Sequence, residues 1–200
     1  MYRFYLAAID MLPGVLLLIP LYWLLNRVYF RNAGNSILYC LFSCYLSVVY
    51  VLVGLPNVTY IRPELNLNLI PFAGIIEDWK NSILNILLFV PLGIFLPLLW
   101  RRFRSAKRTI PTGFLTSLAI ELLQILTFRA TDVNDLITNT LGTYLGFLTI
   151  SRLQRRFPIL NHVTAADRTL DPVIVLCATF LVMFFMYPFI STALWDFILS

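Results

Sequence analysis

The chain has 200 residues and a net charge of +5, with 60% hydrophobic and only 12% charged residues. Soluble domains are near half apolar and a quarter charged, so this composition excludes a soluble domain of useful size and predicts an integral membrane protein. The positive charge does not indicate nucleic-acid binding, because the basic residues lie in short clusters beside apolar runs, where membrane proteins place them to set orientation.

Six apolar stretches are candidates for membrane-spanning helices, which need roughly 20 apolar residues to cross the hydrocarbon layer. In chain order they are residues 4–25, 36–55, 82–100, 109–128, 136–151 and 172–195. Between the second and third stretches lies a long segment containing "LNLNLIPF", which is too polar to cross and too apolar for a plain loop. The predicted fold class is therefore all-α, a polytopic transmembrane helix bundle of about six spans with a partly embedded segment between spans two and three.

The basic residues predict the orientation of these spans. Eleven of the fifteen Lys and Arg residues follow the first, third and fifth stretches, including the segment "RRFRSAKR" at 101–108. Because cytoplasmic loops carry an excess of Lys and Arg, we expect this side to be cytoplasmic. The sequence thus predicts a multi-pass protein of the cell membrane with both termini extracytoplasmic.

Polar side chains gather at the predicted outer ends of three stretches. Glu121 and Gln124 are three residues apart and share a helix face, and Asp132, Asp135 and Asn139 would form one stripe of a helix. An acid inside a span must be paired, protonated or exposed to a water-filled cavity, so this gathering predicts a polar pocket that opens to the outer leaflet. The candidate pocket residues are Asn68, Asn85, Glu121, Gln124, Arg129, Asp132, Asp135 and Asn139.

Structural roles are the alternative for several of these polar residues. Asn81 is interpreted as a helix N-cap, and Arg129 with Asp132 as an interfacial ion pair. The amides are also suited to hydrogen bonds between helices, which average about 0.6 kcal/mol in membranes. Next to them, Gly142 and Gly146 form a GxxxG pattern, which predicts close packing of the fifth span against another helix.

Four motifs in the centre of the chain together resemble the VanZ-like family of bacterial membrane proteins. They are "NLIPF" (68–72), "NILLFVPLG" (85–93), "ELLQ" (121–124) and "RATDVNDLITNTLGTYLG" (129–146). The family's polar positions fall on Asn68, Asn85, Glu121, Gln124, Asp132, Asp135 and Asn139. With this resemblance the chain divides into an N-terminal helical hairpin (1–65), a VanZ-like core (66–150) and a basic cytoplasmic loop with the last transmembrane helix (151–200).

The family's namesake is linked to low-level resistance to the lipoglycopeptide teicoplanin, and the family implies no agreed reaction. We therefore expect an envelope protein whose outer-leaflet pocket binds or remodels a membrane lipid or a lipid-linked cell-wall precursor. An alternative is a membrane enzyme acting on a phosphorylated lipid, with Glu121, Asp132 and Asp135 as candidate ligands of a divalent cation such as Mg²⁺ and one carboxylate as general base. Against it, the chain's one histidine, His162, lies in the basic loop. A transporter ranks third, because the polar residues lie on one side and no inverted repeat is seen.

Overall fold

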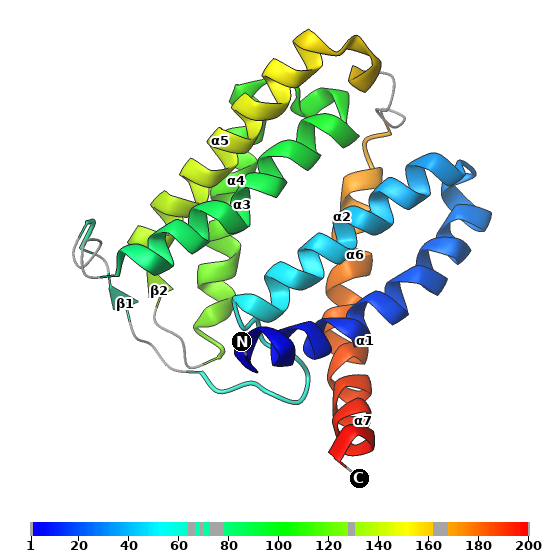
Figure 1. Ribbon diagram of the computed structural model, residues 1–200, viewed down its shortest axis with the longest axis vertical. Coiled ribbons are helices and arrows are strands. Elements are labelled where there is room, and N and C mark those ends of the chain that lie inside the picture. The colour runs from blue at the N-terminus through cyan, green and yellow to red at the C-terminus, as the bar shows by residue number, and fades with distance from the viewer. Residues whose placement is uncertain are drawn as a thin grey trace. The chain divides into compact units, whose positions relative to one another are not determined.

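The fold is all-α. The computed structural model describes residues 2–63, 67–68, 70–72, 78–127, 131–161 and 168–199. In this part of the chain the α-helices are α1 (Tyr2–Leu25), α2 (Ala33–Leu52), α3 (Trp79–Leu99), α4 (Ala106–Gln124), α5 (Val133–Arg156), α6 (Asp171–Leu181) and α7 (Tyr187–Leu199) (Figure 1). One π-helical turn (Asn26–Phe30) continues α1, and another (Val182–Met186) joins α6 to α7. The result is six long helical segments, each of which overlaps one of the six stretches predicted from the sequence.

Four of these segments are long and apolar enough to cross a membrane, which confirms the predicted class while leaving the count of six spans approximate. They are Leu12–Phe30, Ala33–Leu52, Trp79–Leu99 and Asp171–Ile198. Helices α4 and α5 are of similar length but more polar, and both bury polar side chains, such as Ser117 and Thr143, against neighbouring helices. The partial embedding of the segment between α2 and α3 stays a prediction, and residues 64–66, 69 and 73–77 of that segment lie outside the described part.

The chain forms two compact units. The first contains residues 1–61 and 168–200, and the second contains residues 62–167. The predicted division of the chain at 1–65, 66–150 and 151–200 stays a prediction. In the structure the last helical segment shares a unit with α1 and α2. Proximity along the chain and proximity in space therefore differ at this point.

In the second unit, α5 packs along α3 with close contact of the two backbones. Figure 1 shows α3 in green beside α5 in yellow-green. A Cβ atom built on Gly146 would overlap the carbonyl oxygen of Val90, and one on Gly142 would overlap the carbonyl oxygen of Ile86. Both glycines of the GxxxG pattern thus lie where α5 meets the backbone of α3, an approach that small residues permit in membrane helices.

Helix α4 packs on another side of α5. Gly113 leaves room for the side chain of Thr143, which would overlap a Cβ atom at that position. The 3₁₀ turn Arg101–Phe103 connects α3 to α4, so α3 and α4 run in opposite directions. The end of α4 lies beside the start of α5, where Glu121 accepts a hydrogen bond from the Asp132 N–H.

Two very short strands position the chain that precedes α3. Strand β1 (Leu67–Asn68) pairs in parallel with β2 (Thr131–Asp132), with Asn68 opposite Asp132. Because β2 leads directly into α5, this pairing places Asn68 at the N-terminus of that helix. The motif at 68–72 therefore contacts the motif at 129–146, the first and last of the four motifs that resemble the VanZ-like family.

Hydrogen bonds between buried polar side chains stabilise the first unit together with apolar contacts. The hydroxyl of Tyr22 lies 2.6 Å from Ser43 Oγ, and the hydroxyl of Thr179 lies 2.8 Å from the same atom. The hydroxyl of Tyr39 donates to the carboxylate of buried Asp171 at 2.9 Å. These contacts join α2 to α1 and to α6, which explains why the last helical segment belongs to this unit.

Candidate functional site

Polar side chains of β1, β2, α3, α4 and α5 lie near the end of the second unit at which α3 and α5 begin. We call them the polar cluster. Its members are Asn68, Asn85, Ser117, Glu121, Asp132, Asn134, Asp135 and Asn139. Hydrogen bonds between segments far apart in the sequence build the cluster, and three of them involve its acids.

The first contact is made by Asp132, which caps the N-terminus of α5. Its backbone is extended (φ −120°, ψ 124°), and its carboxylate accepts hydrogen bonds from the backbone N–H of Asn134 at 2.7 Å and from Asn68 Nδ2 at 3.0 Å. The first backbone N–H groups of a helix have no partner within it, and an Asp at the N-cap satisfies one of them. The prediction that Asp132, Asp135 and Asn139 form one helical stripe is therefore wrong for Asp132, which lies outside the helix. Only Asp135 and Asn139 are helical.

Glu121 makes the second contact, between the end of α4 and the start of α5. It is only 3% exposed, and its Oε2 accepts a hydrogen bond from the backbone N–H of Asp132 at 3.0 Å. The hydroxyl of Thr131 donates to the backbone carbonyl of Glu121 at 3.1 Å. An acidic acceptor beside a helix N-terminus is favoured by the helix dipole, which gives this buried acid a physical reason to be there.

The third contact joins α3 to the first turn of α5. Asn85 Nδ2 donates to the carboxylate of Asp135 at 2.7 Å, and both side chains are half-buried. Asn81, one turn earlier, is not the N-cap that the sequence suggested. The helix begins at Trp79, so Asp78 occupies the N-cap position and Asn81 lies inside the first turn. Asn81 Nδ2 donates to the carboxylate of Asp78 at 2.6 Å.

Asn139 lies one turn further along α5 and is 4% exposed. Its Nδ2 donates to Ser117 Oγ of α4 at 2.9 Å, while its Oδ1 is buried without a hydrogen-bond partner among the described atoms. A buried acceptor without a donor costs about 1–3 kcal/mol. This atom is therefore suited to a donor supplied by water or by a bound molecule.

Gln124 and Arg129 are the two remaining candidates. Gln124 is buried on the same face of α4 as Glu121, close to the end of that helix. Arg129 lies outside the described residues, so the predicted ion pair with Asp132 stays a prediction.

Sequence reasoning missed two members of the cluster, Asn134 and Ser117. Asn134 is buried, and its Oδ1 accepts a hydrogen bond from the backbone N–H of Phe72 at 2.7 Å. Ser117 lies four residues before Glu121, and this spacing places the two side chains on one helix face. That spacing was a usable signal for Ser117, whereas the contact of Asn134 with the segment before α3 has no local signature.

The three acids do not form a metal site in the described structure. No group of three His, Cys, Asp or Glu side chains lies close enough to hold an ion within the residues described. Glu121, Asp132 and Asp135 instead accept hydrogen bonds from separate donors. Within the described residues the arrangement offers separate carboxylate and amide groups for hydrogen bonding, and a divalent cation at these acids stays a prediction.

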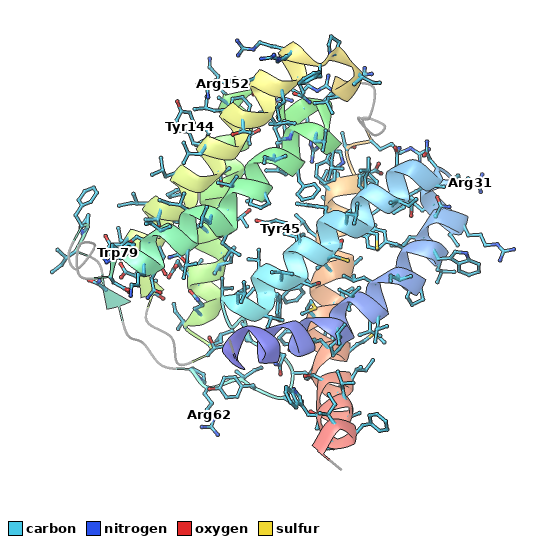
Figure 2. The ribbon with its side chains drawn as sticks, viewed as in Figure 1. Arg31, Tyr45, Arg62, Trp79, Tyr144 and Arg152 are labelled. Carbon is cyan, nitrogen blue, oxygen red and sulfur yellow. The ribbon has the colours of Figure 1, made fainter. Side chains whose placement is uncertain are left out.

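The polar cluster and the basic residues lie at opposite ends of the second unit. Figure 2 shows Trp79, at the start of α3, far from Arg152, near the end of α5. The acids described in this unit are Asp78, Glu121, Asp132 and Asp135. The unit therefore has one acidic and amide-rich end and one strongly basic end.

Comparison with known proteins places this architecture in a family. Residues 36–154 match the VanZ/LLP1 family profile. The chain belongs to the VanZ/LLP1 family. It is 33% identical over 90 residues to Protein VanZ of Enterococcus faecium, an alignment that covers 40% of this chain and 50% of that protein. The chain thus spans about half the length of that curated relative. No solved structure gives a significant match.

The VanZ/LLP1 match runs from α2 to the end of α5, so it includes every residue of the polar cluster. It also includes the glycine contacts between α3 and α5. Together with the apolar helices, membership of the VanZ/LLP1 family identifies a membrane protein.

Proposed function

We propose that this chain is a multi-pass protein of the bacterial cell membrane that binds or remodels a membrane lipid or a lipid-linked cell-wall precursor at the polar cluster. The positive-inside rule supports a cytoplasmic position for the basic end of the second unit. The polar cluster, at the opposite end, would then face the outer leaflet, and both termini would be extracytoplasmic.

The partial exposure of the cluster is the observation that carries this proposal. Asn68, Asn85, Asp132 and Asp135 come from three separate segments, and all four are half-buried at one end of the unit. Hydrogen bonds that only tie helices together need no exposure, whereas a binding site does. Carboxylate and amide oxygens accept hydrogen bonds from hydroxyl and N–H groups, which sugar and peptide head groups carry in large number.

Buried members of the cluster support the same reading. Asn139 presents a buried carbonyl oxygen that has no donor among the described atoms, and Glu121 holds the N-terminus of α5 through the Asp132 N–H. A site whose first layer of groups is held by a second layer keeps its geometry when the ligand binds.

The biological outcome that the VanZ-like resemblance suggests is lowered susceptibility to teicoplanin. A protein that holds or alters a lipid-linked precursor at the outer surface would change what a lipoglycopeptide meets there. The proposed protection against teicoplanin rests on the family resemblance, whereas the proposed binding rests on the polar cluster. The two proposals therefore need separate tests.

The experiment measures survival on teicoplanin in a sensitive Gram-positive host that expresses the chain. The test variants are Glu121→Gln, Asp132→Asn and Asp135→Asn, and the matched control is Asp78→Asn, which removes a carboxylate at the same end but outside the cluster. We expect all four variants to accumulate like the wild type in an immunoblot, and only the control to keep the protection.

Two results would count against the proposal. If the three cluster variants protect as well as the wild type, the cluster is a structural seam between helices. If the wild type gives no protection, the resistance function is wrong. In that case a direct measurement, the co-purification of a lipid-linked precursor with wild-type but not with the Asp135→Asn protein, decides on binding.

A further inference from the structure

The basic end of the second unit contains a cavity of about 470 Å³ between the connection of α3 to α4 and the last turns of α5. Three arginines from two segments line it, together with two polar and two apolar residues. They are Arg104, Arg152, Arg155, Ser151, Gln154, Phe147 and Leu148. The volume falls in the range of small-molecule sites, about 300–1,000 Å³.

The surroundings of this cavity are strongly cationic. Eight Lys and Arg residues lie in the segments around it. They are Arg101, Arg102, Arg104, Lys107, Arg108, Arg152, Arg155 and Arg156. The sequence contains no Asp or Glu from residue 79 to 120 or from 136 to 161, so the segments that build this end supply no negative charge. A concave surface of one sign of charge concentrates the electrostatic field and favours an anion.

The lining changes character along α5. Phe147 is buried and Leu148 is half-buried, and both lie about two turns, roughly 12 Å at 1.5 Å per residue, from Arg155. Ser151 and Arg152 lie between them. One end of the cavity is therefore apolar and lies toward the middle of the helix, while the other end is cationic and lies at the helix terminus.

We propose that this cavity binds an anionic phospholipid, with the phosphate group held by Arg104, Arg152 and Arg155 and the start of an acyl chain against Phe147 and Leu148. The planar guanidinium group of arginine donates in pairs to phosphate oxygens, which suits it to this ligand. Free inorganic phosphate has the same oxygen chemistry. The lipid is the stronger assignment, because only a lipid uses the apolar half of the lining, and basic pockets between membrane helices are suited to anionic head groups.

The test compares two triple variants of the purified full chain in a neutral detergent. Arg104, Arg152 and Arg155 are changed to Gln in one, and Arg101, Arg108 and Arg156, which do not line the cavity, are changed to Gln in the other. Both lose three charges from the same end. Bound phosphatidylglycerol and bound phosphatidylcholine are quantified by native mass spectrometry over a lipid titration.

We expect the wild type to prefer phosphatidylglycerol, and the cavity variant to lose at least about tenfold in apparent affinity for it, since each basic group near an anionic head group contributes on the order of a factor of five. The control variant should lose no more than about threefold. Equal losses in the two variants would overturn the proposal, because the attraction would then belong to the whole basic surface.

Two further arms separate the sources and guard against misfolding. Excess inorganic phosphate, compared with chloride at equal ionic strength, should not displace phosphatidylglycerol, and displacement would overturn the lipid assignment in favour of free phosphate. If the triple cavity variant is aggregated in gel filtration, the single changes Arg155→Gln and Arg156→Gln replace it. These residues are neighbours in the sequence, only Arg155 lines the cavity, and equal behaviour of the two would again overturn the proposal.

Discussion

The carboxylate of Glu121 accepts a hydrogen bond from the backbone N–H of Asp132 at 3.0 Å and thereby joins the end of α4 to the start of α5. The same Asp132 caps α5 with its own side chain and receives the amide of Asn68. One buried acid thus supports the residue that orders two other segments. The consequences for stability and for function are separable by substitution.

Replacing Glu121 by Gln should change the free energy of unfolding by no more than about 1 kcal/mol, because a carbonyl oxygen still accepts from the Asp132 N–H. Glu121→Ala should cost about 2–4 kcal/mol, since it leaves this half-buried N–H without its acceptor and opens a cavity. Thermal unfolding of the purified variants in detergent measures both. If Gln is as destabilising as Ala, the negative charge itself holds the fold, and the loss of protection expected for Glu121→Gln would have a structural cause.

The pair Asn85 and Asp135 should show a measurable coupling between α3 and α5. In a double-mutant cycle of Asn85→Ala and Asp135→Ala, we expect a coupling energy of about 0.6 kcal/mol and at most about 1.7 kcal/mol, the range of polar contacts between membrane helices. The cycle removes the separate effect of Asp135 on the α5 dipole, because that effect is present in the single variant as well. Strictly additive single effects would show that the 2.7 Å contact contributes nothing to stability.

Gly146→Leu should strongly lower the amount of folded protein. A side chain there would overlap the carbonyl oxygen of Val90, which belongs to the backbone of α3 and cannot rotate away. Overpacking of this kind costs about 1–3 kcal/mol or more. Fluorescence-detected gel filtration of a tagged protein measures the loss, and Gly34→Ala is the control, since its Cβ would meet one side-chain atom at 3.4 Å. A normal elution profile for Gly146→Leu would mean that α5 and α3 do not approach so closely.

Labelling with an impermeant thiol reagent in whole cells should distinguish the two ends of the second unit. In a variant without Cys40, Cys44 and Cys177, a cysteine in place of Thr131 should react and one in place of Lys107 should be shielded. The reason is the excess of basic residues at the end that contains Lys107. The reverse pattern would place the polar cluster in the cytoplasm and end its proposed role at the outer surface, although the cluster's geometry would stand.

Much of the fold follows from local features of the sequence. The lengths and hydropathy of six stretches predict six helical segments, and the structure has them, because the length and apolar character of a membrane helix are visible in its own residues. Charge clusters are equally local, so the sequence alone predicts the contrast between the basic turn after α3 and the polar start of α5. The spacing of Gly142 and Gly146 predicts close packing, although the spacing does not name α3 as the partner.

Contacts between distant segments were decided by the tertiary structure. Periodicity predicts which residues share a helix face, but it does not say which neighbour covers that face. Spacing alone therefore predicts that Asp132 belongs to a helical stripe. In the structure, pairing of β1 with β2 keeps the backbone of Asp132 extended, and its side chain caps α5. In the same way, no local pattern predicts that Arg104 lines one cavity with Arg152 and Arg155. Their proximity depends on how the connection of α3 to α4 packs against the last turns of α5. Local conformational propensities depend on neighbouring residues in the sequence, whereas a site assembled from several elements forms only when those elements pack together.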